Sequence, residues 1–501
     1  MTLLIHGGQI LDSTRMAVEL ADILIEGDRI VAVGPDLTAP DGTQKLDAAG
    51  RIVLPGLINA HTHAHNNLMK GSADNWTLED LLNHGAALNA NRTPEDQYVS
   101  AAIGAVEMLK TGCTAACDLF MAVPTPTDEG VEAVARAYID VGLRCMIAPA
   151  VADMVFYRAI PELFDFLPPD IRRTVEGMEA APTAGLLRIT ENAIRRWNGS
   201  ANGRIKVAIA PTTPGQNTDE YLRGCVRLNR EYGVGVHTHL AESKVQAISS
   251  LRRWGKTLVG HLSEIGMVGP RFVGAHAVWL TEEDIRQLAD AGAAVVHNPA
   301  ANLKLGSGIA PIREMLDYGL TVGLGCDGSM SSDNQNLFEA MRFAAMVGKV
   351  RFPHHQDRWV GARDVWKMVT SGSARVLGMA DDIGAVAPGR KADLALLRAD
   401  SVFLRPLSNA VNTLIYAETG ADVDTVLVDG KIVLEHGRTI TIDEERLRAR
   451  AQEAADRVRT QNAAAWAWAE QLTPYIGTAC RKAVATPYPV NRYAAPIIGD
   501  E

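Results

Sequence analysis

Short apolar segments alternate with amphipathic segments through most of the chain. From Ile52 onward, each short apolar segment is followed by a stretch in which apolar residues recur at helical spacing. The predicted helices cover residues 93–110, 129–140, 184–197, 219–232, 243–265, 281–291 and 311–318, with two more near 337–349 and 362–378. Eight strands with helices between them are the count of a (β/α)8 barrel in the α/β class.

The two ends of the chain show a different pattern. Residues 2–11 and 21–34 alternate apolar and polar positions and are punctuated by Gly-Gly, Gly-Asp and Gly-Pro, which is typical of small antiparallel strands. Residues 384–397 and 424–434 repeat this texture and predict two hairpins.

The last part of the chain is less regular. Residues 444–472 are rich in Ala, Arg and Glu at helical spacing and carry Trp466 and Trp468, so we expect a docking helix. Residues 475–501 contain several prolines and predict an irregular tail. The tail either covers the barrel or reaches a neighbouring subunit.

Composition fits a large enzyme and excludes several other classes. At 501 residues and 47% hydrophobic content, the chain can bury a full barrel and a second, smaller unit. A net charge of -10 without a basic stripe argues against nucleic acid and against an anionic membrane surface. The six cysteines lack zinc-ribbon or disulfide spacing, and we expect a reduced, cytoplasmic protein. Neither a signal peptide nor a membrane span is expected.

Polar side chains stand where four of the apolar strands end. Because side chains alternate along a strand, His61 and His63 lie on one face and can bind one cation. The other strand ends carry His237, His239, Glu242, His276 and Asp327. One polar residue at a strand end is ordinary, but imidazoles and carboxylates at four ends are ligands of zinc and iron. The pattern indicates a metal site at the carboxyl edge of the barrel.

These motifs resemble those of the amidohydrolase superfamily, in the branch of cytosine, guanine and S-adenosylhomocysteine deaminases and triazine hydrolases. The motifs are Pro55-Gly-Leu-Ile-Asn-Ala-His-Thr-His63, His239-Leu-Ala-Glu242, Gly274-Ala-His276, the stretch 297–311 and Cys326-Asp-Gly-Ser329. The resemblance covers about residues 2 to 445. It implies a (β/α)8 catalytic barrel at residues 56–381, a composite β-sandwich of residues 1–55 and 382–442, and a C-terminal helix and tail at 443–501.

The resemblance also implies a ligand set with one open position. The implied metal ligands are His61, His63, His239 and Asp327. His239 is preferred over His237 because the spacing His-x-x-Glu places a carboxylate beside the bound water, and His237 is then a partner behind the ligands. Binuclear members use a modified lysine at the end of the fourth strand, where this chain has only Lys206 near the strand's beginning. We therefore expect one divalent metal, with zinc favoured and ferrous iron as the alternative.

Two further side chains are predicted to act on the substrate. Glu242 is the candidate proton shuttle between the bound water and a ring nitrogen. His276 would stabilise charge as the tetrahedral centre forms, or would serve as a fifth ligand. Asp327 completes the predicted catalytic set. His65 is expected in the pocket wall, and His297 could orient Asp327 or a substrate group.

Amide and aromatic groups in the strand-end loops suggest the kind of substrate. Asn66, Gln216 and Asn302 offer paired donors and acceptors, and Trp76 offers a stacking plane, which suits a planar N-heterocycle. Adenosine-type deaminases of this branch commonly carry Trp-Leu and Trp-Pro-x-Glu patterns after the first strand. Here the stretch 83–91 lacks that glutamate, which puts a ribose-bearing substrate in doubt.

The favoured function is hydrolytic deamination of an aminated N-heterocycle such as a purine, pterin, pyrimidine or triazine. Metal-bound hydroxide would attack the carbon of the C–N bond while Glu242 protonates the ring nitrogen. The alternative keeps this site but expels chloride or an alkylamine from a triazine, or cleaves an amide, urea or carbamate. A metal-binding protein without turnover is the third hypothesis. We expect a small-molecule substrate and a homo-oligomer, either a dimer or a tetramer.

Overall fold

Nine strand segments form the central barrel of the structure. A computed structural model of the protein describes residues 2–12 and 15–494. The main barrel strands are β6 (Leu57–His63), β7 (Cys113–Asp118), β8 (Arg144–Ile147), β10 (Ile205–Val207), β12 (Val236–Leu240), β13 (Phe272–His276), β14 (Ala294–His297), β15 (Thr321–Leu324) and β16 (Asp327–Gly328). Nearly every residue of these strands is buried, as expected for strands covered on both faces.

The pairings between the strands are parallel and lead around the barrel. One run joins β16, β6, β7, β8 and β10, and a second joins β12, β13, β14 and β15. A parallel bridge between Ile209 and Val236 links the two runs on one side. On the other side, β15 pairs with β14 and the adjacent β16 pairs with β6. The predicted (β/α)8 architecture is confirmed.

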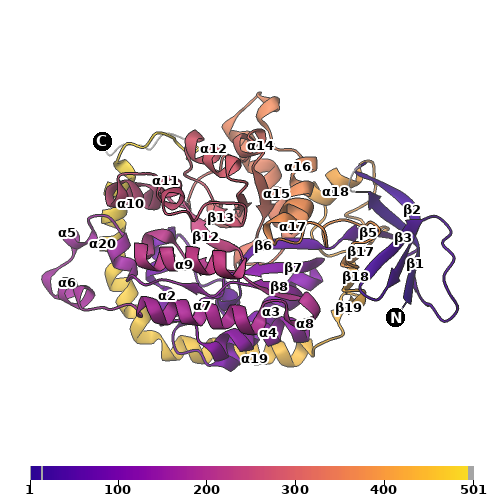
Figure 1. The fold of residues 1–501 in the computed structure, drawn as a ribbon, viewed down its shortest axis with the longest axis horizontal. Coiled ribbons are helices and arrows are strands. Elements are labelled where there is room, and N and C mark those ends of the chain that lie inside the picture. The colour runs from indigo at the N-terminus through magenta and orange to yellow at the C-terminus, as the bar shows by residue number, and fades with distance from the viewer. Residues whose placement is uncertain (1, 13–14, 495–501) are drawn as a thin grey trace.

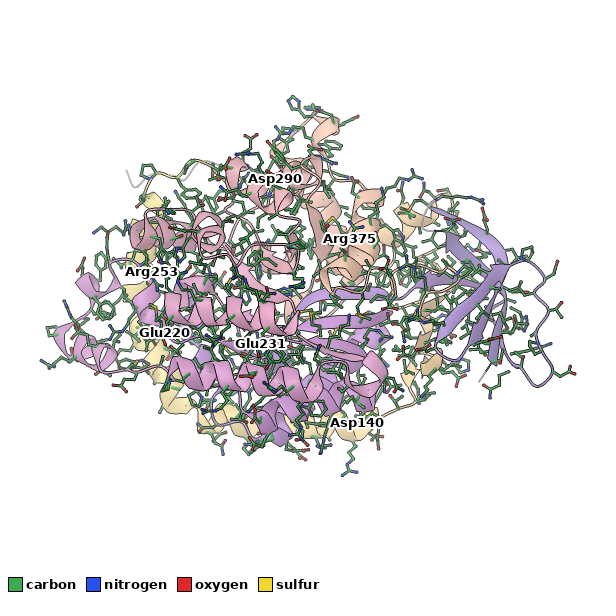
Figure 2. All side chains as sticks on the ribbon, viewed as in Figure 1. Asp140, Glu220, Glu231, Arg253, Asp290 and Arg375 are labelled. Atoms are coloured by element: carbon green, nitrogen blue, oxygen red, sulfur yellow. The ribbon has the colours of Figure 1, made fainter. Side chains whose placement is uncertain are left out.

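Helices surround these strands (Figure 1). They include α3 (Pro94–Lys110), α4 (Asp128–Val141), α7 (Thr183–Trp197), α9 (Asp219–Tyr232), α10 (Lys244–Trp254), α11 (Leu258–Glu264), α12 (Glu282–Asp290), α14 (Ile312–Asp317), α15 (Leu337–Val347), α16 (Ala362–Lys367) and α17 (Ser373–Val376). Their outward faces carry exposed charged side chains such as Asp140, Glu220 and Asp290 (Figure 2). The inward faces supply the apolar side chains that pack on the strands. No helix within residues 2–12 and 15–494 combines the length and apolar character needed to cross a bilayer.

The helix predicted at 243–265 is two helices, α10 and α11. Gly255 ends α10 with a left-handed φ of 66°, and the Thr257 side chain accepts a hydrogen bond from Gly260 N at the start of α11. A glycine in this conformation stops a helix, and a threonine two residues later can begin another.

Strands from both ends of the chain form one nine-stranded sheet beside the barrel. The strands are β1 (Thr2–Asp12), β2 (Ala17–Glu26), β3 (Arg29–Gly34), β4 (Gln44–Asp47), β5 (Arg51–Pro55), β17 (Leu394–Arg398), β18 (Val423–Val428), β19 (Lys431–Glu435) and β20 (Arg438–Thr439). Ile5, Ile23, Val53 and Leu394 share its separate core, which is consistent with the predicted β-sandwich. The boundaries at 55 and 382 stay a prediction.

Only one of the two predicted C-terminal hairpins forms. Strands β18 and β19 pair as an antiparallel hairpin. Residues 384–397 contain a single strand, β17, which pairs with β5 and β18, so the hairpin predicted there is wrong. The N-terminal strand β5 occupies the place beside β17 that a local hairpin partner would take.

The sheet is attached to the barrel by a buried ion pair. Arg144, at the start of β8, donates Nε and Nη2 to the Asp393 carboxylate at 2.9 and 3.1 Å, and its Nη2 also bonds Asp429. The Arg144 side chain is 1% exposed. Because Arg144 begins its strand, this attachment lies at the amino end of the barrel, away from the strand ends that carry the histidines.

The C-terminal segment is more helical than predicted. The chain forms α19 (Glu444–Gln461) and α20 (Ala463–Ala485), and α20 continues past Thr473 and through Pro474. The expectation of an irregular tail from residue 475 is therefore wrong for the residues up to Ala485. Burial of Leu472, Ile476 and Ala479 against neighbouring elements holds this helix in spite of its proline. Residues 495–501, also predicted as tail, lie outside the described residues.

Candidate active site

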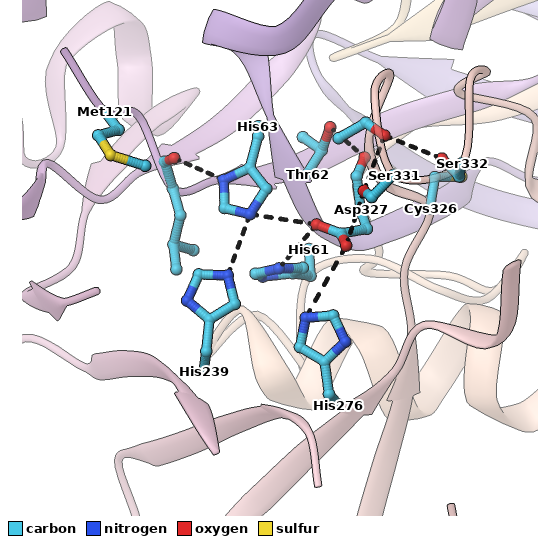
Figure 3. A network of polar contacts seen from close by, with 12 residues as sticks. His61, Thr62, His63, Met121, His239, His276, Cys326, Asp327, Ser331 and Ser332 are labelled. Carbon is cyan, nitrogen blue, oxygen red and sulfur yellow. Dashed lines mark hydrogen bonds and ion pairs between the residues drawn. The ribbon is translucent and has the colours of Figure 1, made fainter. Parts of the chain in front are cut away.

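Three barrel strands bring the four predicted metal ligands together at one end of the barrel. His61 and His63 close β6, His239 lies near the end of β12, and Asp327 opens β16 (Figure 3). One nitrogen from each of the three imidazoles and one Asp327 oxygen all lie within 4.8 Å of one another. All four residues are buried.

The spacing of these atoms suits a metal ion. Asp327 Oδ1 lies 3.3 Å from His61 Nε2 and 3.1 Å from His63 Nε2, and His63 Nε2 lies 3.1 Å from His239 Nε2. Ligand atoms about 2.0–2.1 Å from a tetrahedral cation lie roughly 3.3 Å from each other. The donor set therefore fits a cation at the point on which the three Nε2 atoms converge.

Hydrogen bonds on the far side of each ring fix its orientation. His63 Nδ1 donates to the Leu119 carbonyl at 2.8 Å, and His239 Nδ1 donates to the Thr212 carbonyl. His61 Nδ1 lies 3.3 Å from His237 Nε2. These partners turn Nε2 of each ring toward Asp327, which is the arrangement that metal-binding histidines require. His237 thus stands behind His61, as predicted for it.

Burial and Asp327 control the charges of this cluster. Burial lowers the pKa of His61 and of His239 well below its ordinary value, so both rings are neutral and can donate a lone pair. Burial disfavours ionisation of Asp327, but its contacts with His61 and His63 outweigh that effect and hold its pKa well below the usual range. Burial would lower the pKa of His63 too, but its contact with Asp327 outweighs burial and raises that pKa, so the cluster combines one carboxylate with the neutral rings of His61 and His239.

Glu242 and His276 stand beside the cluster. Glu242 Oε1 lies 3.6 Å from His276 Nδ1, which donates to Asn302 Oδ1 at 2.9 Å. Burial raises the pKa of Glu242 well above its usual range, and the Asp327 carboxylate adds to the effect. Glu242, His276 and Asp327 also approach one another closely enough to share an ion.

The backbone is strained at these strand ends. Ala241, His276 and Asp327 have φ values of 46°, 67° and 65°, a region that residues other than glycine rarely adopt. Such conformations persist only where the surrounding structure enforces them, and they are concentrated at functional sites. Ala241 follows β12, His276 ends β13 and Asp327 opens β16, so these residues set the direction in which the chain leaves the strands.

A cavity of about 370 Å³ opens from the cluster. We call His61, His63, His239, Asp327, Glu242 and His276 the metal end. The outer wall consists of α1 (Leu78–Asn83), α2 (Gly85–Asn89) and the loop of residues 152–182 between β9 (Ala150–Val151) and α7. Its lining side chains are mostly apolar.

The C-terminal helix backs the outer wall. Asn83 Nδ2 donates to the Ala469 carbonyl of α20 at 2.8 Å, and Tyr157 Oη donates to Asn83 Oδ1 at 3.1 Å. Asn83 and Tyr157 both line the cavity. One buried amide therefore connects α1, the 152–182 loop and α20.

The structure separates the predicted substrate-binding residues into two groups. Asn66, Gln216 and the predicted wall residue His65 line the cavity. Trp76 does not line it, because its ring stacks on His84 at 4.2 Å and lies near Trp466.

Asn302 and His297 lie behind the cavity lining. Asn302 orients His276. His297 is 2% exposed, its ring nitrogens bond no described residue, and burial lowers its pKa to about 3. The roles assigned from the sequence to the individual site residues stay predictions.

Several cavity residues were not predicted from the sequence. They include Asn83, Asn89, Met121, Met154, Phe156 and Tyr157. Asn83 and Asn89 fall in residues 83–91, which lack the glutamate that is common in adenosine-type deaminases. That missing glutamate was the signal in the sequence that could have pointed to them. The 152–182 loop gives no motif, because its position depends on packing against α20.

Comparison with known proteins agrees with this geometry. The model of the amidohydrolase family matches residues 52–433. The chain belongs to the amidohydrolase family. The resemblance drawn from the motifs is thereby confirmed, and with it the hydrolase class.

Amidohydrolase relatives align over nearly their whole length. The chain is 34% identical to the 5-methylthioadenosine/S-adenosylhomocysteine deaminase of Caldanaerobacter subterraneus subsp. tengcongensis, covering 89% of this chain and 96% of the relative. It is 33% identical to the 5'-deoxyadenosine deaminase of Methanothermobacter thermautotrophicus, covering 91% and 98%.

Solved amidohydrolase structures superpose closely on the chain. Atrazine chlorohydrolase from Arthrobacter aurescens TC1, in complex with zinc, gives a TM-score of 0.81 at 29% identity over 90% of this chain and all of that one. An adenosine deaminase from Xanthomonas campestris with bound zinc gives 0.80 at 25% identity, covering 91% and 98%. Hydrolases that act on different leaving groups thus share this architecture.

Proposed function

We propose that the protein is an aminohydrolase that uses one zinc ion to deaminate a neutral, aminated N-heterocycle. The observation that carries the proposal is the convergence of His61, His63, His239 and Asp327 at the end of a cavity that Glu242 also lines. A carboxylate in that position has a role in proton transfer and is not needed to complete the ligand set. The deaminase names of the relatives support the same chemistry.

A single ion is favoured by the surroundings of the cluster. Glu242, His276 and Asp327 also form a close group, but it shares Asp327 with the first and so gives no independent second site. Lys206 donates to the Gly378 carbonyl at 3.0 Å and is not at the metal end. Three imidazoles and one carboxylate suit zinc, with ferrous iron as the alternative. When bound, the ion supplies a Lewis acid that lowers the pKa of water from about 16 toward about 7.

Glu242 moves the proton in this proposal. Its carboxylate takes a proton from the attacking water and delivers it to the ring nitrogen next to the carbon under attack. The remaining hydroxyl proton then passes to the amino group, the C–N bond breaks, and ammonia leaves as the carbon becomes a carbonyl. Burial and the neighbouring Asp327 raise its affinity for that proton, as the transfer requires. The backbone N–H of Glu242 donates to Gln246 Oε1 at 2.8 Å, which fixes the turn that carries the side chain.

His276 orients the reactants. Its Nδ1 proton is committed to Asn302 Oδ1, and burial lowers its pKa, so the neutral ring offers a lone pair at Nε2. Nε2 faces Asp327 Oδ2 at 3.9 Å. It can therefore accept a hydrogen bond from the attacking water on the side opposite Glu242.

The cavity favours a neutral substrate. No lysine or arginine is present among the described residues that line it, so a substrate carboxylate or phosphate would be buried without a counter-ion. Asn66 and Gln216 supply amide groups that match the edge of a nitrogen heterocycle.

A second candidate function is the release of chloride or an alkylamine from a triazine. The superposition on atrazine chlorohydrolase favours this candidate, and the same metal end would serve it. The product distinguishes the two functions, since deamination releases ammonia.

The test is an ammonia-release screen of aminopurines, pterins, aminopyrimidines and aminotriazines, with metal analysis of the same sample. We expect close to one zinc per chain and ammonia from at least one ring class. Release of chloride or an amine without ammonia would establish the second candidate. Two metals per chain at full activity would refute the mononuclear site.

The proposal extends to the protein's setting. We infer a cytoplasmic homo-oligomer, either a dimer or a tetramer, that binds no nucleic acid. Free thiols at all six cysteines fit a reducing compartment. Light scattering coupled to gel filtration tests the oligomeric state.

A further inference from the structure

A buried acceptor in the outer wall has no hydrogen-bond partner among residues 2–12 and 15–494. Asn89, the last residue of α2, lines the cavity and is 4% exposed. Its Nδ2 donates to the Gly85 carbonyl at 3.2 Å, which fixes the direction of the amide, because a flipped amide would bring two oxygens together. Its Oδ1 accepts no hydrogen bond from any described residue. A buried acceptor without a donor is costly, so it indicates a donor supplied by a ligand.

The surroundings of Asn89 are apolar and almost without charge. Leu78, Leu82, Met154, Val155 and Phe156 share the outer wall with it. Apart from the metal end, Glu179 is the only acidic residue among the described lining residues, and it is exposed. The outer part of the cavity therefore offers hydrophobic surface with a few neutral polar atoms.

Such a wall is poorly suited to a ribose. Two adjacent hydroxyls are well satisfied by a carboxylate, which has two acceptor oxygens. Asn89 has one oxygen, and its other polar atom is a donor already committed to Gly85. Hydroxyls buried against Leu82, Val155 or Phe156 would lose their hydrogen bonds to water without replacement.

We propose that Asn89 is a specificity-determining residue, and that the site takes a ribose-free heterocycle whose far end carries one N–H donor on an apolar group. The N–H bonds Asn89 Oδ1, and the apolar group lies against the outer wall. This inference rests on the proposed deamination for the identity of the ring. It separates this chain from the relatives named for nucleosides, which it matches at 33–34% identity.

Two matched pairs of compounds test the proposal. 2-Isopropylamino-4,6-diamino-1,3,5-triazine and its 2-isopropoxy analogue share ring, amino groups and alkyl branch, and differ only in N–H against ether oxygen. 9-Propyladenine and adenosine differ in propyl against ribose. In each pair we expect the first compound to give about tenfold higher kcat/KM for ammonia release and a larger rise in Tm on binding.

Variants assign the selectivity to Asn89. Asn89→Leu should reduce the ratio of kcat/KM between the amine and the ether compound to about one, because the N–H of the amine then has no acceptor at residue 89. Asn89→Asp should raise kcat/KM for adenosine relative to that for 9-propyladenine by about tenfold, since a carboxylate can accept hydrogen bonds from both ribose hydroxyls. Asn412→Leu is the control, because Asn412 is exposed on α18 (Ala410–Tyr416) and lies outside the cavity lining. If Asn89→Leu does not fold, Asn89→Asp decides the question.

The outcomes separate this inference from the proposed function. If ammonia is released but kcat/KM is equal for adenosine and 9-propyladenine, the role of Asn89 is refuted and deamination stands. The same holds if the amine-to-ether ratio of kcat/KM is unchanged in Asn89→Leu. If no compound releases ammonia, the Tm shifts still decide. If the amine compound raises Tm more than the ether does, and Asn89→Leu removes that difference, the inference stands although deamination fails. If the compounds bind without that difference, or do not bind at all, the inference is overturned.

Discussion

The metal end and the outer wall of the cavity are built in opposite ways. At the metal end, polar side chains leave strands whose neighbours are fixed, and His63 and His239 are each held by a second hydrogen bond to a backbone carbonyl. The outer wall is made of short helices and a long loop, and it is held in place by a helix from the far end of the chain.

This difference separates chemistry from selectivity. Strand ends of a closed barrel can hold reacting groups to within a fraction of an ångström, as metal binding and proton transfer require. Loops tolerate changes in sequence without loss of the barrel, so they can adapt to different substrates. Structures named for chlorohydrolase and deaminase activities superpose on one architecture for this reason.

Removal of a ligand should break the metal end most completely. We expect His239→Ala to lose its metal and all turnover, because His239 Nε2 belongs to the convergent set. His237→Ala should lower metal affinity by only about 10–100-fold, since His237 acts through His61. Chelator competition with metal analysis measures both. Equal loss in the two variants would contradict the choice of His239.

Removal of the proton shuttle should leave the metal in place. Glu242→Gln keeps the size of the side chain but cannot carry a proton, so kcat should fall by about 10² to 10⁴ with unchanged metal content. Activity within tenfold of the parent would show that Glu242 has another role. Gln246→Ala, which removes only the bond to the Glu242 backbone, should have a smaller effect.

Damage to the outer wall should affect binding more than chemistry. Asn83→Leu removes the buried bonds to Ala469 and Tyr157, so KM should rise by about tenfold while kcat changes little. Hydrogen exchange in residues 463–485 should increase as α20 loosens. Thr473→Ala is the control, because it removes the 3.4 Å contact with the same amide and the Thr473 bond to the Ala469 carbonyl but leaves the bonds of Asn83 to Ala469 and Tyr157 in place. A fall in kcat at constant KM would mean that the wall contributes to chemistry.

The smallest effect concerns the contact between the two regions. Glu79 of α1 accepts a hydrogen bond from Ser243 Oγ at 2.6 Å, next to Glu242, and burial raises its pKa above the ordinary 4.5. A raised carboxyl pKa means that the folded protein binds more protons, so the free energy of unfolding falls as pH rises from 4.5 through the folded pKa. Glu79→Gln should flatten this slope in denaturant titrations from pH 4.5 to 8. An unchanged slope would assign the pH dependence to other groups.

The metal end could be predicted from the sequence and most of the outer wall could not. The local pattern of apolar strands places His61, His63, His239 and Asp327 at strand ends, whereas the choice of His239 over His237 came from the family resemblance. The surroundings of Asn302 and Trp76 could not be predicted, because tertiary contacts decide where a side chain near a strand end points. The Asn302 amide bonds His276, and the Trp76 indole stacks on the His84 ring. Residues 475–485 were predicted as irregular because prolines follow at 487, 489 and 496, whereas α20 extends to Ala485 and is held by packing on α1 and α5 (Leu163–Phe166).

The hydrogen bond from Asn83 to Ala469 joins residues that are 386 positions apart in the chain. Proteins are synthesised from the amino terminus, so every residue of the metal end leaves the ribosome well before α20 does. A nascent chain that has emerged as far as Asp327 holds all four ligands, yet nothing supports its outer wall. The order of translation therefore brings all four predicted ligands out of the ribosome before the helix that supports the outer wall.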